Sequence, residues 1–101
     1  MDQMKYKIIV ADDEYYIRRK LIKIIDYENL GLELAGDFEN GQEVIDYFAG
    51  NRADIVLLDI QMPRVSGLDA AQFLHQNCPD TKVIILSGFD DFAYAQKTLR
   101  Y

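Results

Sequence analysis

The sequence has little cysteine, no long apolar segment and a deficit of basic charge. Cys78 is its only cysteine, so no internal disulfide can form and nothing points to secretion. The longest apolar runs, residues 8–11 and 55–58, are far too short to cross a bilayer. We therefore expect a cytoplasmic protein with no membrane-spanning segment.

The deficit of basic charge argues against two kinds of partner for this domain, nucleic acid and membrane. Eleven Lys and Arg stand against 17 Asp and Glu, which gives a formal net charge of −6. Binding to a nucleic-acid backbone needs clustered Lys and Arg, and a polybasic membrane anchor needs the same. The acidic excess suits metal binding, although a solvated acidic surface is the commoner cause of such a balance. A length of 101 residues predicts one domain, residues 1–101, and half of them are hydrophobic, enough for a core.

Short, continuous and β-branched runs are the clearest structural signal. They occupy residues 8–11, 55–58 and 83–86, and a weaker strand candidate covers residues 32–38. Runs that do not alternate with polar residues are typical of strands buried on both faces, as in a parallel sheet covered by helices.

Helical patterns lie between these runs, at residues 17–25, 44–48, 68–77 and 92–99. In the third of them, Leu68, Ala71 and Leu74 are spaced as one apolar face. Alternation of strands and helices predicts a doubly wound α/β sheet with right-handed crossovers.

Acidic and hydroxyl side chains follow the predicted strands. Asp12 and Asp13 follow the first strand, Asp59 ends the third, and Ser87 with Gly88 follows the fourth. Sites in such sheets form beyond the carboxyl ends of the strands, so the three carboxylates are expected to form a cluster. A divalent cation such as Mg²⁺ relieves their repulsion while a carboxylate attacks phosphorus. Ser87 can donate a hydrogen bond to a phosphoryl oxygen, and Gly88 leaves the backbone room to approach it.

Each of these residues also has an ordinary structural interpretation. Asp12 or Asp13 alone is more simply the N-cap of the following helix, and Ser87 alone is a cap or turn residue. Asp59 is harder to explain in this way, because it ends an apolar run where a carboxylate needs a partner. The ordered set, with each member at a strand end, favours a site.

The sequence from Lys7 onward resembles the receiver domain of two-component response regulators. The resemblance rests on four stretches: Ile8–Glu14, Glu39–Gly41, Ile55–Pro63 with Gly67, and Val83–Gly88. It implies a flavodoxin-like receiver fold with strand order 2-1-3-4. It also implies a phospho-accepting regulatory domain rather than an enzyme, although such a domain can catalyse its own phosphorylation and dephosphorylation.

The resemblance also implies roles for single residues. Asp59 would accept the phosphoryl group from a sensor histidine kinase. Mg²⁺ (or Mn²⁺) would be held by Asp13, Asp59 and the backbone carbonyl of Gln61, with Asp12 acting mainly through water. Ser87 would bind the phosphoryl group. Gln61, Gly88 and Phe89 would modulate the site, and we hypothesise that bulky Phe89 shields the phosphoryl group from hydrolytic water.

The segment Leu86–Ala95 is similar to receivers fused to AraC-type DNA-binding regulators. This implies an output domain outside the sequence and a role in regulating transcription. The family's lysine and its fifth strand and fifth helix would lie beyond Tyr101, so the domain is expected to be incomplete at its C-terminus. Two consequences are expected: dimerisation or exchange of elements between chains, and, as an alternative function, an interaction module that does not take phosphate.

Two further classes fit the sequence less well. A phosphatase of the haloacid-dehalogenase type would need a second Asp where Gln61 stands. A flavodoxin-like cofactor binder would need a phosphate-cradling loop after the first strand, and none is found there.

Overall fold

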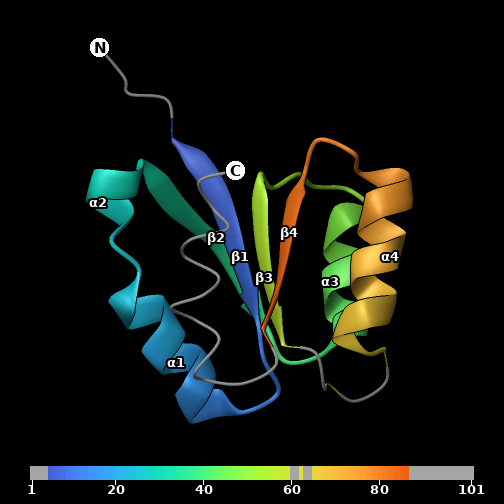
Figure 1. Ribbon diagram of the computed structural model, residues 1–101, viewed down its shortest axis with the longest axis horizontal. Helices are drawn as coiled ribbons and strands as arrows, with labels where there is room; N and C mark the ends of the chain where they lie inside the picture. The colour runs from blue at the N-terminus through green and yellow to red at the C-terminus, as the bar shows by residue number, and fades with distance from the viewer. Residues whose placement is uncertain (1–4, 60–61, 63–64, 87–101) are drawn as a thin grey trace.

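A parallel sheet between two helical layers forms the fold of the computed structural model, which describes residues 5–59, 62 and 65–86 (Figure 1). Its elements are β1 (Tyr6–Ala11), α1 (Tyr15–Ile24), α2 (Tyr27–Leu30), β2 (Leu32–Phe38), α3 (Gly41–Phe48), β3 (Ile55–Asp59), α4 (Gly67–Asn77) and β4 (Lys82–Leu86). The strand order is β2-β1-β3-β4, and every pairing is parallel. The doubly wound sheet and the strand order expected from the sequence are confirmed.

The order of the strands reverses at β1, and this reversal distributes the helices. The chain leaves β1 toward β2 on one side and returns past β1 to β3 on the other. With right-handed crossovers, the helix that connects β1 to β2 lies on one face, and the helices of the two crossovers in the other direction lie on the opposite face. Accordingly, α1 covers one face, and α3 and α4 cover the other (Figure 1).

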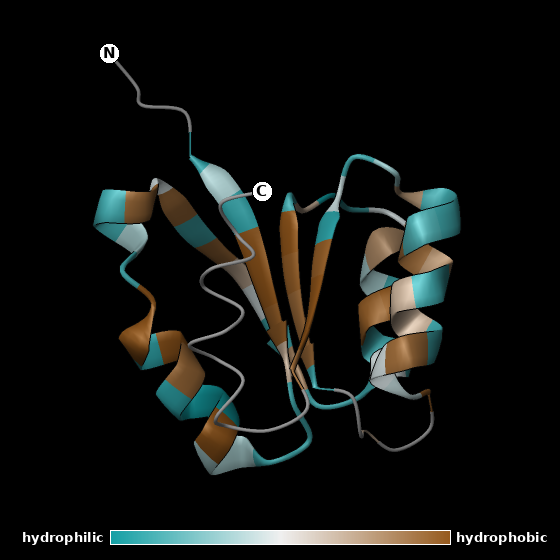
Figure 2. Ribbon diagram, in the orientation of Figure 1, coloured by the Kyte–Doolittle hydropathy of each residue, from teal (hydrophilic) through white to brown (hydrophobic). Residues whose placement is uncertain are grey.

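Each face of the sheet has its own apolar core, as the hydrophobic bands along the strands suggest (Figure 2). The core under α1 contains the buried residues Ile8, Val10, Leu21, Ile25, Leu32, Leu57, Ile84 and Leu86. The core under α3 and α4 contains Ile9, Ala11, Val44, Ala53, Val56, Leu58, Met62, Ala70 and Leu74. Neighbouring residues of one strand thus enter opposite cores, which explains why the strands read as continuous apolar runs.

The helices differ from the sequence prediction in three details. The helix α2 was not predicted; Asp26 caps its start, and Gly31 ends it with a left-handed φ of 67°. Ile25 is buried, but it lies just after α1 rather than within it. Leu68, which we placed on the apolar face of its helix, is 55% exposed, because the buried face of α4 runs through Gly67, Ala70 and Leu74 instead. The helix predicted over residues 92–99 lies outside the described residues.

Candidate functional site

The register of β1 and β3 brings the predicted acidic residues to one place. These strands are parallel neighbours, and Ala11 pairs with Leu58. Asp12 follows Ala11 directly, and Asp59 follows Leu58 and ends β3. Because adjacent parallel strands lie roughly 5 Å apart, their carboxyl-end side chains meet at one edge of the sheet.

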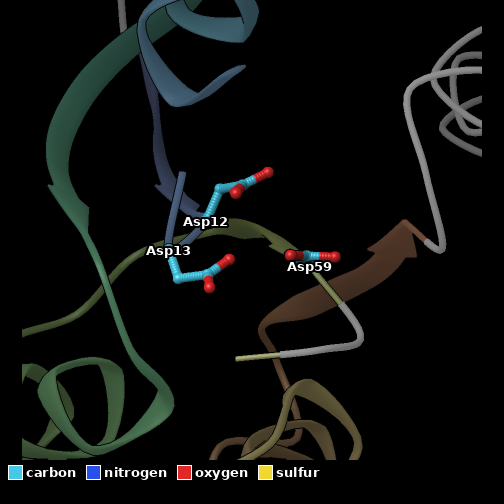
Figure 3. Close-up of side chains that lie close together, drawn as sticks. All are labelled: Asp12, Asp13 and Asp59. Carbon is cyan, nitrogen blue, oxygen red and sulfur yellow. The ribbon is translucent and has the colours of Figure 1, made fainter. Parts of the chain in front are cut away.

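Asp12, Asp13 and Asp59 form the acidic cluster that the sequence predicted. One carboxylate oxygen from each lies within 4.8 Å of the other two, and Figure 3 shows the three side chains converging at the strand ends. Asp12 is buried, Asp59 half-buried and Asp13 exposed. Two like charges about 4 Å apart near a protein surface repel by about 4 kcal/mol. The cluster is therefore an arrangement that a bound cation would relieve.

Asp12 is held firmly by its backbone and side chain. Its amide donates to the carbonyl of Phe38 at 3.0 Å, and its Oδ1 accepts the amide of Glu14 at 2.8 Å. Burial raises the pKa of Asp12; the hydrogen bond from Glu14 opposes this effect, the negative charges of Asp13 and Glu14 add to it, and Arg18 opposes it. The chain thus places a carboxyl group where its negative charge is disfavoured.

Neither Asp12 nor Asp13 is the N-cap of α1, which was the simpler interpretation of each residue on its own. Glu14 is the N-cap residue, and its side chain makes no capping hydrogen bond. The carboxylate of Asp12 instead closes a turn of two residues onto Glu14, which fixes its direction before the helix begins.

Arg18 and Asp37 border the cluster, and sequence reasoning assigned them no role. The Nε of Arg18 donates to Oδ2 of Asp37 at 2.8 Å, and its Nη1 donates to the carbonyl oxygen of Asp12 at 2.6 Å. The amphipathic pattern of α1 placed Arg18 simply away from the apolar face. The predicted strand at 32–38 contains two charged residues, Glu33 and Asp37, and nothing in the sequence distinguishes the one that pairs with Arg18.

The start of α3 contacts Val65, which lies two residues before α4. Asn40, which is buried, caps α3 by accepting the amide of Glu43 at 2.8 Å, and Glu43 accepts the amide of Glu39 at 2.9 Å. The amide of Gly41 donates to the carbonyl of Val65 at 3.2 Å. A side chain at Gly41 would overlap the backbone of Val65, so this close approach requires glycine.

The remaining predicted site residues are not placed by the structure. Gln61, Ser87, Gly88 and Phe89 lie outside the described residues. Within residues 5–59, 62 and 65–86, the three aspartates form the one group of His, Cys, Asp or Glu side chains arranged closely enough to hold a metal ion. No helix among the described residues is long and apolar enough to span a membrane.

The fold and the site together define an α/β domain of the flavodoxin-like class, with a carboxylate cluster where the strand order reverses. A family model described as "Response regulator receiver domain" matches residues 8–101. The chain therefore belongs to the receiver domain family of response regulators, whose function is to accept a phosphoryl group.

Relatives with known names agree with this assignment. The chain is 36% identical over 96 residues to the uncharacterized transcriptional regulatory protein YesN of Bacillus subtilis, covering 95% of this chain and 26% of YesN. It is 32% identical over 100 residues to the transcriptional regulatory protein DegU of Brevibacillus brevis, covering 99% of this chain and 42% of DegU. The chain thus spans less than half the length of these two relatives.

A solved structure shows the same fold. The REC domain of AraT, a response regulator from Geobacillus stearothermophilus, is 31% identical and superposes with a TM-score of 0.79, covering 96% of this chain and 75% of that one. The resemblance to receiver domains inferred from the sequence is confirmed.

Proposed function

We propose that Asp59 accepts a phosphoryl group beside a divalent cation, which Asp13 binds directly and Asp12 binds mainly through water. The observation that carries this proposal is the convergence of the three carboxylates within 4.8 Å at the ends of β1 and β3. Asp59 ends β3, whereas Asp12 and Asp13 follow the neighbouring strand β1, so the proposed acceptor lies opposite the other two carboxylates.

The donor set fits Mg²⁺ or Mn²⁺. Both are hard cations that prefer oxygen ligands, and Mg²⁺ binds through few protein carboxylates and keeps several waters. Asp13 and Asp59 would hold the cation together with the backbone carbonyl of Gln61, and Asp12 would act mainly through water. When bound, the cation neutralises charge on the phosphoryl oxygens and lets a carboxylate approach phosphorus.

In the proposed transfer, a carboxylate oxygen of Asp59 forms a bond to phosphorus as the phosphorus–nitrogen bond of a phosphohistidine breaks. The histidine leaves with the bonding electron pair and takes up a proton. Ser87 donates a hydrogen bond to a phosphoryl oxygen, Gly88 lets the backbone approach, and Phe89 restricts the access of water. The donor is a sensor histidine kinase, and the readout is an output domain that regulates transcription.

The chain acts in this proposal as a regulatory domain, with residues 1–101 as one receiver domain. It catalyses no reaction on a separate substrate, but its site promotes its own phosphorylation and dephosphorylation. Cytoplasmic location and association between copies of the chain remain predictions from the sequence.

Intact mass measured after incubation with Mg²⁺ and acetyl phosphate tests the proposal. We expect one phosphoryl adduct on the chain, lost in Asp59→Asn and lost when a chelator removes the cation. Asp80→Asn is a matched control, since Asp80 is an exposed aspartate outside the cluster, and it should keep the adduct. A folded chain that acquires no adduct would overturn phosphate acceptance and favour the interaction module.

A further inference from the structure

The guanidinium of Arg18 connects three separate parts of the molecule. It is carried by α1, donates from Nε to Oδ2 of Asp37 on β2, and donates from Nη1 to the carbonyl of Asp12 at the end of β1. Its carbon Cζ also lies 5.6 Å from the ring centroid of Tyr15. These contacts fix both the position and the plane of the guanidinium, because its donors form a rigid fork.

The carbonyl that Arg18 contacts belongs to the peptide unit joining Asp12 to Asp13. A peptide unit is planar, so holding its oxygen fixes the direction in which Asp13 begins. On the N-terminal side of Asp12, its amide donates to the carbonyl of Phe38, and its side-chain Oδ1 accepts the amide of Glu14. Arg18 therefore completes the set of contacts that orients the two neighbouring carboxylates of the acidic cluster.

The Arg18–Asp37 pair is placed to do this reliably. The side chain of Arg18 is only 11% exposed, and that of Asp37 is 34% exposed. Because the long side chain of Arg18 is largely shielded from water, the pair keeps its geometry better than one in which both side chains are fully exposed. Asp37 pairs with Val10 in the sheet, so the backbone of the residue that binds the guanidinium is held beside β1.

We infer that Arg18, oriented by Asp37, is a positioning residue that sets the geometry of Asp12 and Asp13 for the divalent cation. This inference rests on the proposed function, because it assigns a role in holding the cation proposed there. Arg18 makes no contact with the cation or the phosphoryl group in this role. It acts only through the peptide unit between the two aspartates.

Charge and geometry predict opposite effects of removing this arginine. Arg18 is a cation beside a cation site, so if only its charge mattered, its loss would tighten binding of a divalent ion. If its main effect is on the direction of the carboxylates, its loss weakens binding. Partners that orient metal ligands typically change metal affinity by about 10-fold or more when removed. The sign of the change therefore separates the two roles.

Binding of Mn²⁺ to the 101-residue chain, followed by the electron paramagnetic resonance signal of the free ion, measures this sign. We expect Arg18→Gln to weaken Mn²⁺ binding by about 10-fold. Arg18→Lys keeps the charge but loses the fork, so it should restore only part of the affinity. Arg19→Gln removes the same charge from the adjacent, exposed position of α1, and it should leave binding unchanged or slightly tighter.

Circular dichroism of each variant, recorded below its unfolding temperature, confirms that folded protein is being compared. Should Arg18→Gln fail to fold, Arg18→Lys carries the test by itself, since it retains the ion pair's charge. Equal or tighter Mn²⁺ binding by the folded Arg18 variants overturns the positioning role and leaves the proposed function standing. Absence of Mn²⁺ binding by the unmodified chain overturns the proposed function, and the positioning role with it.

Discussion

The two ends of β3 each carry an aspartate, and the two aspartates have opposite surroundings. Asp54 precedes the strand at its amino end, where Oδ2 accepts the amide of Lys7 at 2.7 Å. Asp59 ends the strand at its carboxyl end, where two other carboxylates lie within 4.8 Å. The carboxylate of Asp54 thus accepts a backbone amide, whereas that of Asp59 lies beside two further carboxylates of the same charge.

The backbone around Asp54 explains its role. Its amide donates to the carbonyl of Lys7, and its carbonyl accepts the amide of Lys82, each at 2.8 Å. Nearby, the hydroxyl of Thr81 donates to the carbonyl of Ala53 at 2.8 Å. Asp54 therefore joins β3 to the starts of both neighbouring strands. The hydrogen bonds at this end of the sheet stabilise the pairing of the strands.

The carboxyl end is built differently, because several of its polar groups orient carboxylates rather than join strands. A carboxylate whose partners are N–H groups contributes to stability, whereas carboxylates gathered together lower it unless a cation is bound. The position of an aspartate at a strand end therefore says little by itself. The groups around the carboxylate decide whether the aspartate stabilises the fold or forms part of the acidic cluster.

The largest effect is expected at Gly41, where α3 starts at the carboxyl end. Gly41→Ala should lower the free energy of unfolding by about 2–3 kcal/mol, because the new methyl group overlaps the backbone of Val65. Urea denaturation measures the change. Gly50→Ala, beyond the other end of α3, is the control, since an added Cβ there has no atom within 4 Å. Equal stability of the two variants would show that the backbone at Val65 can move to accommodate the methyl group at no cost in stability.

A smaller effect is expected at the amino end. Asp54→Ala should lower the free energy of unfolding by about 1 kcal/mol, because the amide of Lys7 loses its carboxylate partner. Thermal unfolding of the chain alongside Asp80→Ala, which removes an exposed aspartate from the nearby loop, gives the comparison. If both variants lose the same stability, Asp54 has no special role in joining the strands.

The smallest effect is expected at Asp12, and it has the opposite sign. Folding raises its pKa above the ordinary value of 3.8, so the folded chain retains this proton over a range in which the unfolded chain has lost it. The stability contributed by Asp12 therefore falls as pH rises through that range. With a chelator present, Asp12→Asn should raise the free energy of unfolding at neutral pH, and the gain should disappear under acidic conditions.

Denaturation series of the chain and of Asp12→Asn from acidic to neutral pH measure this difference. A variant that is less stable than the unmodified chain at neutral pH would mean that the hydrogen bond from Glu14 outweighs burial and repulsion.

The strands and the acidic cluster were predictable because both follow from short stretches of sequence. Continuous apolar runs marked β1, β3 and β4, and the rule on strand ends then selected Asp12, Asp13 and Asp59. The strand order followed from the family resemblance.

Contacts made between distant segments were not predictable in the same way. Arg18 and Asp37 are 19 positions apart, and nothing in the sequence patterns of α1 and β2 indicates which residues of the two elements contact each other. The role of Asp54 was missed because its partners are backbone amides and carbonyls, which every residue has. The helix α2 was missed because four residues show no periodicity, although Asp26 and Gly31 supplied its end signals.

The acidic cluster draws on two segments that are far apart in the chain and meet only when β1 pairs with β3. In the unfolded chain, Asp12 and Asp13 are therefore separated from Asp59, and no comparable ligand set exists. A cation held by all three would bind the folded chain selectively, and by mass action it would shift the folding equilibrium toward the native state. The affinity for the cation would then also be measurable as the increase in the free energy of unfolding that the cation produces.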